Sequence, residues 1–263
     1  MSAASAASPA TRAPAPPMRG AGRLAWYSFA KLVTNPFSLA FAIALPILMY
    51  LMFGANQDYS GMWAGHANVA ATVLVNMALY GAVMTTSSAG ANVSLERTSG
   101  VTRLFALTPL SPAAQIAARV LAGIGAAGVV IGVTYVFGAL TGSRMEGPAW
   151  AVSALLLVVL AVLPTVLGLA AGFAVRSDGA FAATSIVTVL CSFLSGMFIP
   201  LEQMGSFFQS TAPWTPFHGI VQLVQLPLTG WDGFRWSWVA NYAVWTLLFA
   251  GVAVWGQRRD TGR

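Results

Sequence analysis

The residues that could carry out chemistry in this chain are few and widely separated. Seven carboxylates and two histidines occur in 263 residues. An active site needs such groups to converge, and a proton-coupled transporter needs one of them inside the membrane. Here every carboxylate falls in a predicted loop or in the C-terminal tail, and His66 and His218 lie far apart in the sequence. The pattern predicts no catalytic site and no metal site, and it argues against secondary transport.

Binding and hydrolysis of ATP through a P-loop is excluded in the same way. A P-loop needs Gly-Lys followed by Ser or Thr, whereas the single lysine, Lys31, lies between Ala30 and Leu32. The single cysteine, Cys191, also excludes an internal disulfide and a cysteine metal cluster. We therefore expect no cofactor on this chain, and an active pump would need a separate chain to supply its energy.

The composition of the chain is that of a protein surrounded by lipid, and it predicts which segments form helices. Hydrophobic residues make up 57% of the chain and charged residues 8%, against about 25% charged residues in soluble domains. A charge at the centre of a membrane helix costs about 2.5–3.5 kcal/mol, and six apolar stretches contain none. The sequence predicts an all-α integral membrane protein with six transmembrane helices, at 37–54, 68–90, 120–140, 149–174, 180–200 and 237–256.

The cations predict the orientation of these helices. If the N-terminus is cytoplasmic, eleven of the thirteen lysines and arginines lie in cytoplasmic segments, and only Arg144 and Arg235 lie outside. Cytoplasmic loops carry such an excess of cations, so both termini are expected to be cytoplasmic. Residues 1–20 are predicted to be a disordered tail, and 259–263 a second tail. Nucleic acid is not expected as a partner, because no basic cluster alternates with aromatic residues.

Residues 21–35, before the first span, have the pattern of an amphipathic helix. Trp26, Phe29 and Val33 gather on one face of it. We expect an interfacial helix on the inner leaflet, with a plain juxtamembrane extension as the alternative. Asn35-Pro36 is expected to end this helix, because proline disfavours helix at the residue before it.

The outer segment between the fifth and sixth spans is long and contains several prolines. It holds two possible short amphipathic helices, near 201–211 and 217–226, and neither is long enough to span. We expect a helical hairpin that dips into the outer leaflet. A seventh, broken span is the alternative.

The longest cytoplasmic loop, 91–117, contains a third helical pattern. Its apolar residues recur at i, i+3, i+4 and i+7, and polar residues oppose them. The apolar members are Val101, Leu104, Phe105 and Thr108, and the polar members are Glu96, Ser99, Gly100 and Arg103. Such a helix is expected to dock on a partner; a solvated connector is the alternative. Ser111 and Pro112 predict the start of the next helix, as N-cap and first helical residue.

Small polar residues form two seams inside the spans. On the second span they are Thr72, Asn76, Tyr80 and Ser87, and on the fifth span they are Thr184, Thr188, Ser192 and Ser195. These seams could line a substrate path, or they could hold helices together by hydrogen bonds worth about 0.6–2 kcal/mol each; the second interpretation is favoured. Two further motifs, Gly128-x-x-x-Gly132 and Gly168-x-x-x-Gly172, are expected to allow close helix packing.

The order and spacing of short motifs resemble the permeases of bacterial type-2 ABC exporters. Residues 96–100 (ERTSG), followed by Leu104 and by 108–111 (TPLS), resemble the loop signature between the second and third spans of that family. Asn35-Pro36 resembles the turn into its first span, and 196–202 (GMFIPLE) resembles the segment after its fifth span.

A fourth motif lies before the sixth span. Residues 214–217 (WTPF) are similar to the family's N-P segment, with Thr215 in place of asparagine. The resemblance covers residues 20–258, and it is closest to the daunorubicin-type drug-resistance permeases. It implies that residues 21–258 form one permease domain in a bacterial inner membrane.

The resemblance also implies a cytoplasmic coupling helix, at 92–107, that contacts a separate ATP-binding subunit. The residues implied in this contact are Glu96, Arg97, Gly100, Val101, Arg103, Leu104 and Phe105. ATP and magnesium would bind to that partner, and two permease copies would form a dimer. The expected substrate is a hydrophobic or amphiphilic drug, antibiotic or lipid. The alternatives are export of a polysaccharide or glycolipid, or an ATP-independent channel or scaffold.

Overall fold

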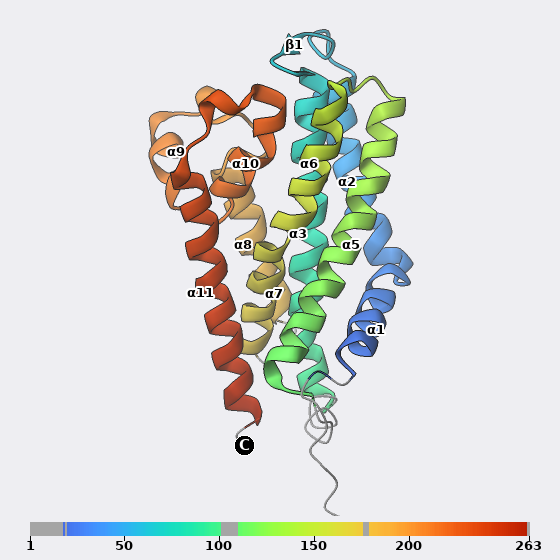
Figure 1. Ribbon diagram of the computed structural model, residues 1–263, viewed down its shortest axis with the longest axis vertical. Helices are drawn as coiled ribbons and strands as arrows, with labels where there is room; N and C mark the ends of the chain where they lie inside the picture. The colour runs from blue at the N-terminus through green and yellow to red at the C-terminus, as the bar shows by residue number, and fades with distance from the viewer. Residues whose placement is uncertain (1–17, 19, 101–109, 176–178, 262–263) are drawn as a thin grey trace, which may run out of the picture.

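The computed structural model describes residue 18 and residues 20–100, 110–175 and 179–261. Long helices lie side by side, and the connecting segments gather at the two ends of the bundle (Figure 1). The main helices are α1 (Ala21–Val33), α2 (Pro36–Tyr50), α3 (Val69–Thr98), α5 (Pro112–Leu140), α6 (Gly147–Leu160), α7 (Val162–Ala174), α8 (Gly179–Leu194), α10 (His218–Thr229) and α11 (Trp236–Thr261). Shorter pieces are the π-helix Leu51–Ala55, the 3-10 turns Leu201–Gln203, Ala212–Trp214 and Trp231–Gly233, the helix α9 (Ser206–Thr211), and two antiparallel strands, β1 (Trp63–Ala64) and β2 (Ala67–Asn68).

We name the two ends of the bundle by what gathers there. The charged end holds the last turn of α3, the start of α5 and the last turns of α11, where the Gln257 side chain donates to that of Gln115 at 3.2 Å. The capped end holds β1, β2, α9 and α10 (Figure 1).

Each predicted span overlaps an apolar helix, but these helices differ in length. Within the described residues, four helices are long and apolar enough to cross a membrane: Val69–Thr98, Pro112–Leu140, Gly147–Ala174 and Trp236–Arg259. The apolar helices Leu39–Ala55 and Gly179–Leu194 are shorter. A 16-residue helix such as α8 extends about 24 Å, against a hydrocarbon core of about 30 Å. The structure supports a helical membrane protein, and the count of six spans remains a prediction.

Proline and serine set two helix starts where the sequence predicted them. α1 ends at Val33 and α2 begins at Pro36. The Ser111 hydroxyl accepts a hydrogen bond from the amide of Ala114 at 3.2 Å, and Pro112 follows as the first residue of α5. The helix that contains the third predicted span, 120–140, therefore begins at Pro112, because the cap and not the onset of apolar sequence determines where a helix starts.

The predicted start of the coupling helix at 92 is wrong, and its residues 101–107 lie outside the described residues. α3 continues without a break past the predicted span end at 90, as far as Thr98. Polar residues need not end a helix when neighbouring helices satisfy them, and the Ser94 hydroxyl donates to the carbonyl oxygen of Val175, just beyond α7, at 2.7 Å. Glu96 and Arg97 therefore lie on the last turn of α3.

α3 and α7 pack with their backbones almost in contact. A Cβ added at Gly168 would collide with the carbonyl oxygen of Ser87, and one added at Gly172 would lie 2.7 Å from the carbonyl oxygen of Gly90. Small residues permit such close approach between membrane helices. The packing role predicted for the Gly168 motif is confirmed.

The motif on α5 makes no such contact within the described chain, and its packing role remains a prediction. A Cβ added at Gly128 or Gly132 would meet no atom within 4 Å. These glycines lie on the surface of the described chain, so neither one brings two of its helices together.

α8 and α11 lie with apolar surface outward. On α8 the buried residues are small or hydroxylated, whereas Ile186, Leu190 and Phe193 are exposed. In the most apolar 18-residue stretch of α11, only 11% of the residues are buried within the described chain. Outward apolar faces are the expected arrangement where the surrounding solvent is lipid.

The capped end is held by side-chain amides. Asn68 caps α3, because its Oδ1 accepts from the amides of Ala71 at 3.0 Å and Arg144 at 2.9 Å. Nδ2 of Asn241, on α11, donates to the carbonyl oxygens of Pro213 at 2.8 Å and Thr215 at 3.1 Å. These bonds hold the segment before α10 against α11. The two short helices predicted here are present as α9 and α10, and their insertion into a leaflet remains a prediction.

Candidate functional site

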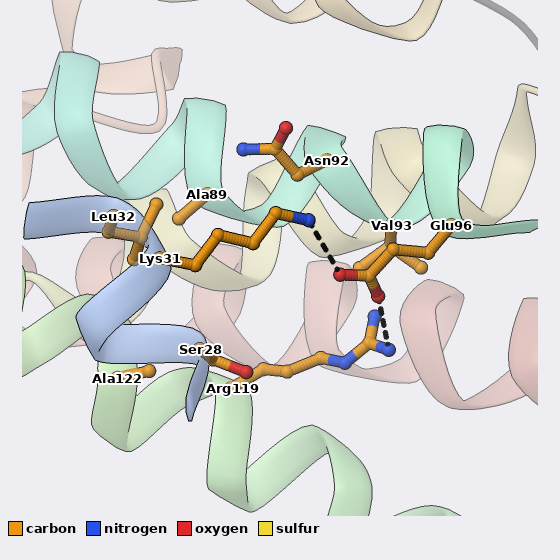
Figure 2. A pocket seen from close by; sticks show the side chains of 9 residues that line it. All are labelled: Ser28, Lys31, Leu32, Ala89, Asn92, Val93, Glu96, Arg119 and Ala122. Atoms are coloured by element: carbon orange, nitrogen blue, oxygen red, sulfur yellow. Dashed lines mark hydrogen bonds and ion pairs between the residues drawn. The ribbon is translucent and has the colours of Figure 1, made fainter. Parts of the chain in front are cut away.

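Three charged side chains meet at the charged end, between α1, α3 and α5 (Figure 2). The Glu96 carboxylate lies between Nη2 of Arg119 at 2.8 Å and Nζ of Lys31 at 3.3 Å. The side chain of Arg119 is 9% exposed and that of Lys31 is 48% exposed. We call Lys31, Glu96 and Arg119 the ionic cluster. Because a buried guanidinium needs an anionic partner, the Glu96–Arg119 pair is the part that ties α3 to α5.

Small residues allow the three helices to approach around the ionic cluster. Ala89 of α3 and Ala122 of α5 line a narrow cleft beside it, together with Ser28 and Leu32 of α1. The cleft encloses about 30 Å³, which is room for a water molecule. The cluster therefore lies in a close-packed junction that opens to the surface beside Lys31.

α1 runs lengthwise along α5. Gly20 lies near Leu110, and the ring of Phe29 is 3.0 Å from where a Cβ of Gly125 would lie. Phe29, on the predicted apolar face of α1, therefore packs against α5, whereas Trp26, on the same face, is 70% exposed. The position of this helix on the inner leaflet remains a prediction.

Arg97 forms a second junction, with the end of α7. Its Nη1 donates to the carbonyl oxygens of Gly172 at 3.0 Å and Phe173 at 2.7 Å, and its guanidinium carbon lies 5.8 Å from the centroid of the Phe173 ring. Carbonyl groups at a helix C-terminus lack intrahelical partners and carry partial negative charge. A guanidinium at this position supplies the missing hydrogen-bond donors and balances the partial negative charge. Arg97 therefore links α3 to α7 at the charged end.

We expect Arg97→Ala to lower the free energy of unfolding by about 2–3 kcal/mol, because hydrogen bonds to a charged group are worth about 1.5–3 kcal/mol. Arg97→Lys should fall between Ala and the parent, since an ammonium keeps the charge but not the planar fork. Thermal unfolding of the purified protein in one detergent measures this. Arg235→Ala, an exposed cation at the capped end, is the control, and equal unfolding midpoints for all three variants would exclude the junction.

The other residues predicted for coupling lie at or beyond the end of α3. Gly100 has a φ of +78°, a conformation that glycine adopts without strain and that commonly ends a helix. Its role in the described structure is to terminate α3. Val101, Arg103, Leu104 and Phe105 lie outside the described residues.

The polar seam on α3 is used for hydrogen bonds within the chain. The Ser87 hydroxyl donates to the Pro164 carbonyl oxygen at 3.2 Å. Nε2 of Gln225, on α10, donates to Oδ1 of Asn76 at 2.6 Å. The predicted path residue Thr72 bonds to its own helix, through the carbonyl oxygen of Asn68 at 3.4 Å.

An aromatic pair occupies the same seam. Tyr80 is 5% exposed, and its ring meets that of Phe198 edge-on at 4.8 Å between centroids. The contacts of the α3 seam fit helix packing, and a transport role for these residues remains a prediction.

The seam on α8 is buried and only partly satisfied. Thr184 donates to the carbonyl oxygen of Ala180 at 2.7 Å, and Ser195 donates to that of Ser192 at 3.1 Å. The hydroxyls of Thr188 and Ser192 are buried and have no hydrogen-bond partner among the described residues. Buried hydroxyls without partners are exceptional in packed interiors. This seam is therefore the stronger of the two candidates for a path that holds water or substrate.

A cavity of about 470 Å³ opens at the capped end. Its walls come from the π-helix, the start of α3 and the 198–203 segment, and the lining is mainly apolar. The lining residues are Phe53, Tyr59, Val69, Val73, Phe198, Ile199, Pro200 and Gln203. Its volume is that of a pocket for a small organic molecule. No sequence pattern predicts this cavity, because its walls come from segments that are distant along the chain.

The sequence also did not reveal Lys31 and Arg119 as partners of Glu96. One signal was available for Arg119: it directly precedes the predicted span beginning at 120, and a charge so close to lipid requires a partner. The identity of that partner depended on the register of α3 against α5, which the sequence does not specify.

The helices and the apolar outer surface are those of a multi-pass membrane protein, with charged groups concentrated at the end of the bundle where α3 passes to α5. The model of the ABC-2 type transporter family matches residues 21–227, and the chain belongs to that family, whose members are the membrane components of ABC transporters. This chain is therefore a membrane subunit for transport rather than a catalytic subunit.

One relative, from Bacillus subtilis (strain 168), bears the name "Putative transport permease YvfS". It is 24% identical to this chain over 191 residues, which cover 71% of this chain and 76% of that protein. The similarity supports the same family and does not define a subgroup.

Proposed function

We propose that this chain is the membrane-spanning permease of an ATP-driven exporter in a bacterial inner membrane. The observation that carries the proposal is the position of Glu96 and Arg97, immediately before the loop that joins α3 to α5. Glu96 is bonded to α1 and α5, and Arg97 to α7. A partner that moved this loop would therefore act on three helices at once.

The proposed partner is a separate ATP-binding subunit, and two copies of the permease form the pore. ATP and magnesium bound by that subunit supply the free energy. In this chain, Val101, Leu104 and Phe105 would dock the loop on the partner, while the ionic cluster and Arg97 pass its displacement to the bundle. The bundle has six crossings with both termini cytoplasmic, and rigid-body rocking of the helices alternates access to the two sides.

The proposed substrate is hydrophobic or amphiphilic, such as a drug, an antibiotic or a lipid. Two features support this class. The cavity at the capped end has no charged residue in its lining, and the α8 seam offers only small hydroxyl groups. Both environments favour an uncharged, mostly apolar molecule over a highly hydrated sugar chain.

The proposal is tested by mild-detergent purification of the tagged protein from its native host, followed by mass spectrometry. We expect a P-loop ATPase to copurify in stoichiometric amount, and Phe105→Asp to release it while the permease stays inserted. Reproducible absence of an ATPase, with the permease folded, would overturn the pump in favour of a channel or scaffold. A copurified ATPase with export of a polysaccharide would keep the pump and overturn the substrate class.

A further inference from the structure

The exposed face of α1 carries two cations with two aromatic residues between them. Arg23 is exposed, and Lys31 lies about two turns further along the helix. Trp26 and Tyr27, between these cations, are 70% and 64% exposed. Cations beside exposed tryptophan and tyrosine are typical of protein surfaces at the boundary between lipid headgroups and acyl chains.

The ionic cluster has a net positive charge, because Lys31 and Arg119 are cations and Glu96 is its one anion. Glu96 supplies a single negative charge, and Arg119 is its closer and more buried partner, at 2.8 Å against 3.3 Å for Lys31. The ammonium of Lys31 therefore keeps attraction for a second anion, and its 48% exposed side chain can be reached from the surface.

A neutral donor lies beside this ammonium. The side chain of Asn92 lines the same cleft as Lys31 (Figure 2), and its carboxamide makes no hydrogen bond to the described residues. An ammonium and a carboxamide N–H at one cleft mouth suit a singly charged group with several acceptor oxygens. The enclosed space of about 30 Å³ holds a water molecule, so such a group would lie at the mouth.

We propose that Lys31 and Asn92 bind the phosphate group of an anionic phospholipid, with Trp26 and Tyr27 against its glycerol and upper acyl region. The binding is a property of the chain alone and does not require transport or an ATPase. A phosphate on Lys31 would compete with Glu96 for the ammonium and loosen the tie between α1 and α3. The lipid would thus set how firmly α1 is held to the ionic cluster.

The test measures binding of three probes to the purified chain by native mass spectrometry: dioleoyl phosphatidylglycerol, dioleoyl phosphatidylcholine and inorganic phosphate. We expect phosphatidylglycerol to bind more tightly than phosphatidylcholine, and inorganic phosphate not to displace it. Lys31→Gln should weaken phosphatidylglycerol binding about fivefold, the effect of one cation at an anionic lipid surface. Lys31→Arg should restore it, and Arg235→Gln should leave it unchanged.

Lys31→Gln leaves Glu96 paired with Arg119, so the variant is expected to fold. Equal binding of the two lipids, or unchanged phosphatidylglycerol binding in Lys31→Gln, would overturn the site. Lys31-dependent binding of inorganic phosphate with no gain for the lipid would assign a soluble anion and overturn the lipid. None of these results depends on whether an ATPase partner exists, so failure here and failure of the proposed function are separable.

Discussion

Replacing Glu96 with glutamine is expected to abolish transport and to lower the free energy of unfolding by about 3 kcal/mol or more, the usual cost of removing one partner from a buried ion pair. The Arg119 side chain, 9% exposed, would keep its charge and lose its carboxylate. Lys31 adds little to this loss because exposed pairs contribute about 0–1 kcal/mol. Chemical unfolding in detergent gives the stability, and substrate efflux from vesicles containing the partner ATPase gives the transport rate.

Two further variants separate stability from coupling. Glu202→Gln, an exposed carboxylate at the capped end, should change neither quantity. Glu96→Gln combined with Arg119→Met should recover much of the stability, since no buried charge remains, yet transport should stay lost because α3 and α5 are no longer tied. Full transport in this double variant would refute a coupling role for the ionic cluster.

Gly168→Ala is expected to destabilise the protein by about 3 kcal/mol or more, which is at the upper end for overpacking. The added methyl would collide with the Ser87 carbonyl oxygen. That atom belongs to the backbone, so no change of rotamer relieves the contact and α3 and α7 must separate. Separation would also stretch the hydrogen bonds from Arg97 to Gly172 and Phe173. Unfolding midpoint and the folded fraction after size-exclusion chromatography measure the effect.

Gly128→Ala is the matched control on α5. Because its added Cβ meets nothing within 4 Å, the substitution should be neutral or should stabilise α5 by up to about 1 kcal/mol through helix propensity. Similar losses for the two alanine variants would contradict the close α3–α7 contact.

Charge exclusion and local capping made much of the helical framework predictable. Lipid rejects charges along the whole length of a span, so six apolar stretches could be located, and each overlaps an apolar helix. Pro36 and the pair Ser111-Pro112 act through neighbours in the sequence, and their effects were predicted correctly. The helix that matches the predicted span 149–174 is interrupted at the single residue Ala161, close to Pro164.

Interactions between distant segments could not be predicted. The end of α3 was placed too early because a run of polar residues signals the end of a span, whereas a helix continues wherever partners such as Arg119 and the α7 carbonyl oxygens are available. The two glycine motifs look alike in sequence and differ in structure, since the α3–α7 contact involves only one of them. The cavity at the capped end joins residues from Phe53 to Gln203, and no local pattern specifies such a meeting.

The outward position of α11 has an evolutionary consequence. Where a helix contacts mainly lipid, selection acts on the total hydrophobicity of its residues and only weakly on the shapes of their side chains. Many exchanges among leucine, valine, alanine and phenylalanine should therefore be tolerated. Drift of this kind erases recognisable sequence while leaving the helix in place.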